Sequence, residues 1–274
     1  MKMEMYSLFK GVSCLTGKER KKAAFSFFAV LIALGAIGEQ ANAQGGSKGH
    51  PWPSEYVTKQ IDAMTMTGTD GESWMFRRDQ YIRYSTNDDR VHIGPKKVAD
   101  GWPGLAGTGF DKGINAISHT GTDGEYWMFR GEQYIRYSTN DDRVHIGPKK
   151  VADGWPGLAG TGFDKGINAI SRTGTAGEYW MFKGGQYIRY STNDNRIHVG
   201  PKKIADGWPG LRSTTYVDGI DAMSPTGTTG EYWMFRGDSY VRYSTKDDSV
   251  HIDKAIVDGW KGLDHFLMSK CVGP

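Results

Sequence analysis

The feature that most constrains this chain is an internal repeat of 53 residues. A short motif, Ile followed by Asp or Asn, then Ala and then Met or Ile, occurs four times, beginning at Ile61, Ile114, Ile167 and Ile220. A fixed period of this size is typical of repeat architectures, in which each unit buries its apolar surface only by packing against its neighbours. The fold therefore has to be interpreted as one unit used four times.

Each repeat predicts four short antiparallel strands followed by a connector. In the second repeat we expect strands over 114–118, 125–130, 133–138 and 144–146. The Asp123-Gly124 pair between the first two is a hairpin signal. The connector is expected to contain a short helical turn ending at Gly154, followed by Trp155-Pro156-Gly157-Leu158.

The predicted strands carry large apolar side chains on both faces of the sheet. Trp127 and Phe129 point one way and Met128 the other, and Tyr134 lies opposite Ile135. A sheet that is apolar on both faces must be covered on both, and four sheets packed around an axis achieve this. We therefore predict an all-β, four-bladed β-propeller with blades at about 55–105, 106–158, 159–211 and 212–263. Four connector tryptophans are interpreted as core between the blades rather than as a ligand platform: Trp102, Trp155, Trp208 and Trp260.

The two ends of the chain differ from the repeats. Basic residues precede an apolar run at 23–38, and Ala41-Asn42-Ala43 follows with small residues, so residues 1–43 are predicted to be a signal peptide cleaved after Ala43. An uncleaved N-terminal anchor is the alternative. Residues 44–54 are expected to be a flexible leader and 264–274 a tail. A cleaved leader predicts a secreted protein, extracellular or in the endomembrane lumen.

The charge balance and the cysteines both change when the leader is removed. The chain has 34 basic and 31 acidic residues, and residues 1–43 contain six and three of them, so 28 of each remain. A nucleic-acid binder would need a concentrated basic face, so this class is not expected. Of the two cysteines, Cys14 would be lost with the leader, which leaves Cys271 and no internal disulfide.

The repeat resembles the hemopexin repeat. The resemblance rests on the Asp-Ala inner strand, the aromatic-Phe-(Lys/Arg)-Gly and Tyr-x-Arg-Tyr motifs, and the Gly-Pro-Lys connector ending in Trp-Pro-Gly-Leu, over residues 55–263. A chain made of one such domain is similar to the legume albumin-2 seed proteins and to bacterial hemopexin-like proteins, with matrix metalloproteinase domains more distant. Because the animal domains join their first and last blades by a disulfide and this chain cannot, closure is expected to depend on packing of blade 1 against blade 4, helped by the C-terminal segment 264–274.

The inner strands are the candidate site. The unpaired edge of each innermost strand faces the axis, and alternate carbonyls of a strand point the same way. Two rings of backbone oxygens are therefore expected, and such oxygens suit Ca²⁺ or Na⁺. The resemblance implies Ca²⁺, Na⁺ and Cl⁻ in this channel; a channel that holds only water is the alternative. The first ring comprises Asp62, Asn115, Asn168 and Asp221, and the second Met64, Ile117, Ile170 and Met223.

The histidines and acidic turns are interpreted as structural. Four histidines recur on the predicted outermost strands, too far apart to share a metal: His92, His145, His198 and His251. His50, His119 and His265 do not recur. Asn and Asp in hairpin turns, as at 87–89, are favoured for conformational reasons alone.

The leading functional hypothesis is a secreted, non-enzymatic binding protein, monomeric or dimeric. Its ions would be structural, and its ligand a small molecule of the kind that the resemblance implies, a polyamine or haem. The alternative is a lectin-like or defensive toxin-like protein that recognises glycans or receptors. No nucleophile–base pattern or phosphate-binding loop is present in the sequence, so an enzyme is not expected.

Overall fold

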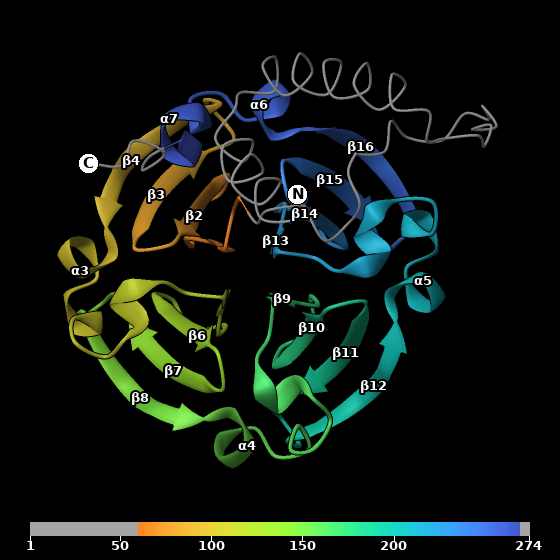
Figure 1. The fold of residues 1–274 in the computed structure, drawn as a ribbon, viewed down its shortest axis with the longest axis horizontal. Helices are drawn as coiled ribbons and strands as arrows, with labels where there is room; N and C mark the ends of the chain where they lie inside the picture. The colour runs from red at the N-terminus through yellow and green to blue at the C-terminus, as the bar shows by residue number, and fades with distance from the viewer. Residues whose placement is uncertain (1–59, 269–274) are drawn as a thin grey trace, which may run out of the picture.

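The computed structural model describes residues 60–268, which form four separate four-stranded antiparallel sheets around a central axis (Figure 1). In each sheet the strands follow one another in chain order from the axis outward. The predicted four-bladed propeller is therefore confirmed. The predicted signal peptide and leader, Cys14, His50 and Cys271 lie outside the described residues.

The four blades have matching strands. Blade 1 contains β1 (Ala63–Met66), β2 (Glu72–Arg77), β3 (Gln80–Ser85) and β4 (Arg90–Lys97). Blade 2 contains β5 (Ala116–His119), β6 (Glu125–Arg130), β7 (Gln133–Ser138) and β8 (Arg143–Lys150). Blade 3 contains β9 (Ala169–Arg172), β10 (Glu178–Lys183), β11 (Gln186–Ser191) and β12 (Arg196–Lys203). Blade 4 contains β13 (Ala222–Pro225), β14 (Glu231–Arg236), β15 (Ser239–Ser244) and β16 (Ser249–Ala255).

Short helices follow the outer strands. The α-helical turns are α3 (Val98–Gly101), α4 (Val151–Gly154), α5 (Ile204–Gly207) and α6 (Ile256–Gly259), and α7 (Leu263–Met268) is the last element of the described residues. The 3₁₀ turns are η2 (Pro103–Leu105), η3 (Phe110–Lys112), η4 (Phe163–Lys165), η5 (Pro209–Leu211) and η6 (Thr215–Asp218). None of the helices in residues 60–268 is long and apolar enough to span a membrane.

Two strands of blade 2 differ from the prediction in their boundaries. The inner strand runs over Ala116–His119 rather than over 114–118. The outer strand is longer than 144–146 and runs over Arg143–Lys150, so Pro148 and the lysines after it belong to a strand rather than to a turn. Proline is tolerated there because β8 pairs only with β7 and its other edge needs no N–H donor. The register of this pair shifts between Tyr134 and Tyr137.

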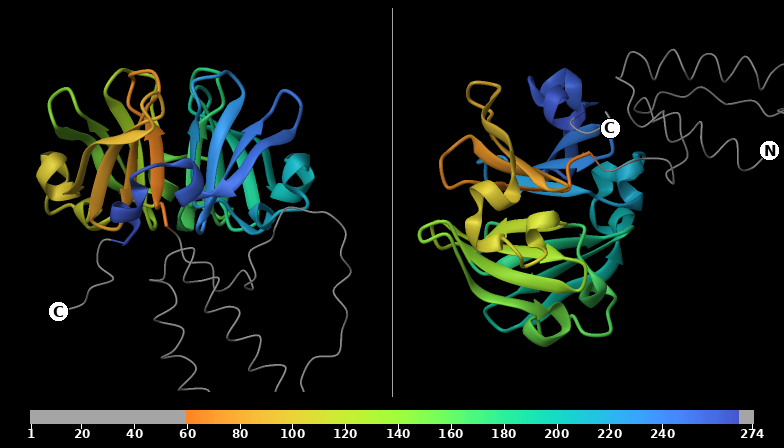
Figure 2. Two further views of the ribbon diagram at one scale, coloured as in Figure 1. Left: turned by 90° about the horizontal axis from the view of Figure 1, so that it is seen from above. Right: turned by 60° about the vertical axis from the view of Figure 1, so that its left-hand side comes forward.

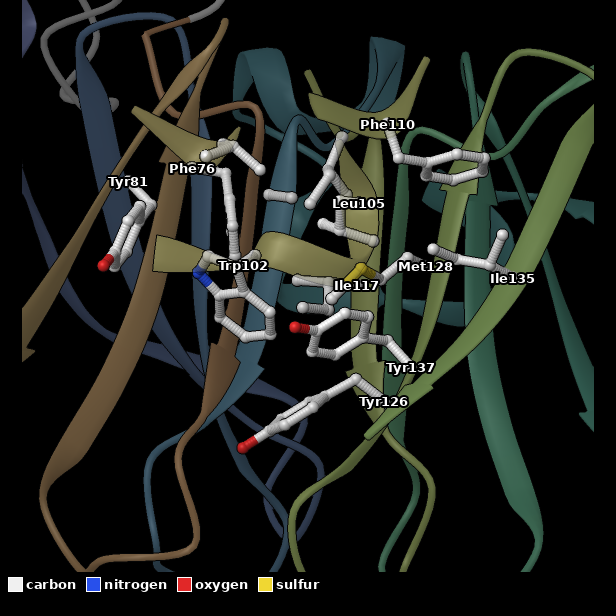
Figure 3. Close-up of a cluster of buried hydrophobic side chains, with 13 residues drawn as sticks. Phe76, Tyr81, Trp102, Leu105, Phe110, Ile117, Tyr126, Met128, Ile135 and Tyr137 are labelled. Atoms are coloured by element: carbon white, nitrogen blue, oxygen red, sulfur yellow. The ribbon is translucent and has the colours of Figure 1, made fainter. Parts of the chain in front are cut away.

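The core consists of four clusters, one between each pair of neighbouring blades. Figure 3 shows the cluster between blades 1 and 2, in which Trp102 lies between Phe76 of one blade and Tyr137 of the next. The ring centroids of Trp102 are 5.4 Å from Phe76 and 5.2 Å from Tyr137. Met128 faces this cluster whereas Phe129 faces the next one. The prediction that successive side chains of one strand serve opposite interfaces is confirmed.

The connector tryptophans are core residues, as predicted. Trp102, Trp155, Trp208 and Trp260 are each 2% exposed. The glycine before each tryptophan is required by a close approach. A Cβ on Gly154 would lie 1.8 Å from the hydroxyl oxygen of Tyr134, and the equivalent glycines meet equivalent tyrosines in the other three blades. The recurring Gly-Trp pair therefore reflects the packing of the helical turn against its own sheet.

The ring closes where blade 4 meets blade 1, and the C-terminal helix completes this interface. Leu263 and Phe266 of α7 are fully buried in one cluster with Ile61 and Met64 of blade 1 and Trp260 of blade 4. At the other interfaces the equivalent places are filled by connector residues, for example Leu105 and Phe110. The described part of the C-terminal segment therefore takes part in closure through packing.

A hydrogen bond shows the same replacement of a connector by α7 at the interface between blades 4 and 1. Arg130 at the end of β6 donates from Nη1 to the carbonyl oxygen of Gly113, at the end of the connector before its blade, over 2.7 Å. Within residues 60–268 no connector precedes blade 1, and there Arg77 donates from Nη1 to the carbonyl oxygen of Phe266 over 3.2 Å. The α7 helix thus replaces a connector in both its apolar and its polar contacts.

Trp155→Ala should lower the free energy of unfolding by about 3–5 kcal/mol, the usual cost of removing a buried large aromatic side chain. The reason is that Trp155 contacts aromatic rings of two blades, Phe129 at 5.2 Å and Tyr190 at 5.2 Å. The measurement is urea denaturation of the purified protein. Val257→Ala is the matched control, because Val257 is 49% exposed and its truncation should change the free energy of unfolding little. Equal effects of the two changes would contradict a core role for Trp155.

Candidate binding site in the central channel

The innermost strands of the four blades surround the axis (Figure 1). β1 lies beside β5 and β13, and β9 lies beside the same two strands, so the four form a ring. Each inner strand pairs within its own sheet on one edge only. A group that binds on the axis would therefore meet the backbone and small side chains of all four blades.

The two ends of the channel belong to different faces of the propeller. The side view in Figure 2 separates a face formed by hairpin turns from a face that carries the connectors and α7. The inner strands begin at the connector face and end at the turn face. The turn face is defined by residues 67–71, 120–124, 173–177 and 226–230, which join the first and second strands of each blade.

The first predicted ring lies at the connector face, and its four residues have the same local geometry. The Asn115 N–H donates to the carbonyl oxygen of Phe129 over 2.8 Å, and its side-chain Oδ1 accepts from the N–H of Gly131 over 2.8 Å. Asn168 and Asp221 make the same two hydrogen bonds. Their side-chain oxygens accept from the N–H of Gly184 and of Gly237, respectively. Asp62 does likewise, with the N–H of Arg78 as the donor to its carboxylate.

This geometry accounts for the occurrence of both Asp and Asn at that position. The side chain has to supply one oxygen acceptor for a backbone N–H of the next hairpin, which either residue can do. Sequence reasoning did not find this role. The signal that could have found it is the restriction to Asp and Asn in all four repeats, because both residues favour local side-chain-to-backbone hydrogen bonds.

The second predicted ring lies two residues further along each inner strand. Its side chains are 1% exposed and lie in four different clusters between the blades: Met64, Ile117, Ile170 and Met223. These side chains pack between blades, so only the backbone of these residues is a candidate for the axis.

A ring of hydroxyl side chains follows, which sequence reasoning missed. Its members are at most 3% exposed: Thr65, Ser118, Ser171 and Ser224. The Thr65 Oγ1 accepts the N–H of His119 over 3.1 Å and so links two neighbouring inner strands. A hydroxyl residue at one position in all four repeats was the available signal.

A cavity of about 310 Å³ opens at the turn-face end of the channel. Residues from all four blades line it, among them His119, Arg172 and Glu231. The last residue of each inner strand lines this cavity, and it is of a different type in every blade: Met66, His119, Arg172 and Pro225. The fourfold symmetry of the channel is therefore broken at this end.

The recurring histidines hold hairpins on the periphery and do not converge. His198 Nε2 is 2.9 Å from Asp194 Oδ2 in the turn before its strand, and its Nδ1 is 3.1 Å from Glu178 Oε1. The other three make equivalent pairs within their own blades. Within residues 60–268, no group of three or more His, Cys, Asp or Glu side chains is arranged to hold a metal ion.

The acidic turns serve conformation and packing. Their last residues, Asp89, Asp142, Asn195 and Asp248, have φ between 52° and 56°, in the left-handed region that Asn and Asp tolerate best. The Tyr84 hydroxyl donates to Asp89 Oδ1 over 2.5 Å, and Lys261 pairs with the same carboxylate over 2.8 Å. Hydrogen bonds from Lys261 and Tyr84 lower the pKa of Asp89.

Comparison with known proteins agrees with the repeat pattern. The hemopexin family model matches residues 167–213. Albumin-2 of Pisum sativum is 33% identical over 222 residues, which cover 76% of this chain and 94% of that protein.

Solved structures of plant proteins are also similar to this chain in fold. The hemopexin fold protein CP4 from cow pea superposes with a TM-score of 0.70 at 27% identity, covering 75% of this chain and 97% of that one. A plant lectin with two metal binding sites from Cicer arietinum superposes with a TM-score of 0.68 at 31% identity, covering 74% and 96%.

His198→Phe should raise the pKa of Asp194 from about 2 towards its ordinary value, because the hydrogen bond from His198 is the main cause of the lowered pKa. The stability that Asp194 contributes is present above its unfolded pKa and is lost as pH falls towards about 2. The stability difference between wild type and variant should therefore shrink below pH ~4. An NMR titration of the Asp194 carboxyl carbon measures the pKa. His145→Phe, the same change in blade 2, is the control and should leave that titration unmoved; an unmoved pKa in His198→Phe would contradict the assignment.

Proposed function

The chain belongs to the hemopexin family, together with the legume albumin-2 proteins, and on this premise we propose that it is a secreted, non-enzymatic binding protein whose channel holds a structural cation. The cation of choice is Ca²⁺, with Na⁺ as a second candidate and Cl⁻ as a candidate for the amide groups of the same channel. The ion would connect four blades that are otherwise joined by side-chain packing and a few hydrogen bonds.

The observation that carries this proposal is the identical anchoring of four inner-strand residues. Asp62, Asn115, Asn168 and Asp221 are each fixed by their N–H and by their side-chain oxygen to their own blade. Two fixed points on one residue define its backbone, so we infer that the four carbonyl oxygens occupy equivalent positions around the axis. Ca²⁺ takes six to eight oxygen ligands and accepts backbone carbonyls. The carbonyls of Met64, Ile117, Ile170 and Met223 would supply a second ring.

The solved relatives support an ion in this architecture. The Cicer arietinum lectin is described as having two metal binding sites. Carbonyl rings of this kind bind a hard cation without a cluster of acidic side chains, so the exchange of Asp for Asn between blades is compatible with the proposal. Backbone oxygens supply the ligands in every blade alike.

For the small ligand we propose a polyamine ahead of haem. Carbonyl oxygens accept hydrogen bonds from ammonium groups as readily as they bind metal ions, so a linear polyamine suits a narrow channel. Haem needs an imidazole with a free ring nitrogen. Each recurring histidine is placed between two carboxylates, and His119 is considered below. Glycan recognition is the alternative, since one neighbour is described as a lectin; a glycan array would detect it.

Ca²⁺ should raise the unfolding temperature of residues 44–274, and a chelator should lower it. A ligand that binds only the folded ring stabilises it by mass action, about 2.7 kcal/mol when present at 100 times its Kd. The measurement is thermal unfolding with added Ca²⁺ and with EGTA, together with metal analysis of the purified protein. No copurifying metal and no effect of the chelator would mean that the channel holds only water.

A variant separates the backbone from the carboxylate as the ligand. Asp221→Asn should reduce the Ca²⁺ effect only modestly, because Asn115 and Asn168 already occupy equivalent places. Asp258→Asn, on the exposed side of α6, removes the same charge away from the channel and is the control. Complete loss of the Ca²⁺ effect in Asp221→Asn alone would show that the carboxylate is the ligand and that the proposed ring is wrong.

A further inference from the structure

The turn-face end of the channel is the one place where the four inner strands carry four different side chains. Met66, His119, Arg172 and Pro225 occupy the same strand position. The residues before and after them are far more uniform: hydroxyl residues precede, and Thr-Gly follows in every repeat. The differing position lies in the wall of the 310 Å³ cavity. This volume is at the lower end of the range for small-molecule sites, about 300–1,000 Å³.

His119 presents a hydrogen-bond donor in this wall. The backbone N–H of Gly121 donates to His119 Nδ1 over 3.0 Å, so Nδ1 is the acceptor of the ring. The proton of the neutral imidazole is therefore on Nε2, because one ring nitrogen donates when the other accepts. Burial and the nearby Arg172 lower the pKa of His119, which favours that neutral form. The Nε2 atom is buried and has no hydrogen-bond partner in the part of the chain that the structure describes.

Arg172 places a positive charge beside this donor. Gly121 is the residue whose N–H is hydrogen-bonded to His119. The Nη2 of Arg172 lies close to it, 3.6 Å from the position that a Cβ on Gly121 would take. The Nε of Arg172 is buried without a hydrogen-bond partner, as is the Nε of Arg189 in the same blade. None of the ion pairs within residues 60–268 includes Arg172, unlike Arg189 of the same blade, which pairs with Glu178 over 3.7 Å.

Two of the four turns around the cavity carry a carboxylate, and Glu231, which also lines the cavity, is paired with Arg242 over 3.8 Å. Asp70 and Asp123 occupy the turns of blades 1 and 2, where their carboxylates approach Gly227 and Gly68. The same turn position in blades 3 and 4 is Ala176 and Thr229. Arg172 lies on blade 3, whose turn lacks a carboxylate, next to His119 of blade 2. His119 Nε2 and Arg172 Nε call for an acceptor, because both are buried without a partner among the described residues and buried polar groups are nearly always hydrogen-bonded.

We propose that this cavity is a second binding site, which takes a small organic carboxylate. The carboxylate would accept from Arg172 and from His119 Nε2, a pairing that charge strengthens. The body of the ligand would lie against Met66, Pro225 and Tyr232 in the remaining wall. Because His119 Nε2 carries the proton, its lone pair is not available to haem iron in this tautomer. The site is at the opposite end of the channel from the first carbonyl ring and goes beyond the proposed calcium function, which can fail independently.

The test uses benzoate as the probe and benzamide as its uncharged match, titrated into residues 44–274 by calorimetry in chloride-free buffer. Benzoate should bind at one site per chain and benzamide at least tenfold more weakly. Arg172→Gln should weaken benzoate binding at least tenfold. Arg143→Gln removes the same charge from an exposed position at the start of β8 and should change the Kd less than twofold. His119→Phe should weaken binding severalfold.

The outcomes are distinct from those of the calcium experiment, because EGTA should leave the benzoate titration unchanged. Equal binding of benzoate by Arg172→Gln and wild type, at equal unfolding temperatures, would overturn the proposal. So would equal affinities for benzoate and benzamide, or displacement of benzoate by chloride at similar concentration. Competition by spermidine would assign the mouth of the channel to a cation instead and would overturn it as well.

Discussion

Every sheet in this molecule is apolar on both faces, and the rest of the structure depends on that constraint. A single blade could cover neither Met128 on one side nor Phe129 on the other, and each of these side chains is fully buried only because a different neighbouring blade is present. One connector tryptophan fills each interface. The stability of the ring is thus a sum of interface terms between neighbours, as in other repeat proteins, with one additional term for closure.

The same constraint explains where binding can occur. Both faces of every sheet are buried against neighbouring blades, so the side chains on those faces belong to the core. Only the edges of the sheets are left to bind a ligand. The outer edges carry exposed lysines and histidine–carboxylate pairs, which suit a solvated edge. The inner edges meet at the axis, where the proposed backbone ring at one end and the asymmetric cavity at the other would give two different chemistries in one channel. The first uses what the repeats share, and the second uses the single strand position at which they all differ.

Much of this followed from the sequence because the pattern was repeated. The two middle strands of blade 2 were predicted to the residue, since alternation and the flanking turns define Glu125–Arg130 and Gln133–Ser138. The inner strand begins later than predicted because the side chain of Asn115 engages a turn before pairing becomes regular. The outer strand continues through Pro148, since an edge strand does not need the missing N–H. The lining of the cavity was missed for a different reason: comparing repeats for what recurs hides Met66, His119, Arg172 and Pro225.

The part played by α7 has a consequence for synthesis. The face of blade 1 that carries Met64, Met75 and Ile82 is covered by blade 4 and by Phe266, which are made after blades 2 and 3. Blades 1 to 3 can pack on one another as they leave the ribosome, whereas this apolar face stays exposed until residues near the C-terminus emerge. Such exposure is the condition under which nascent chains aggregate or need a chaperone. A chain that stops before Leu263 would contain all four sheets but would lack the α7 side chains that cover this face of blade 1.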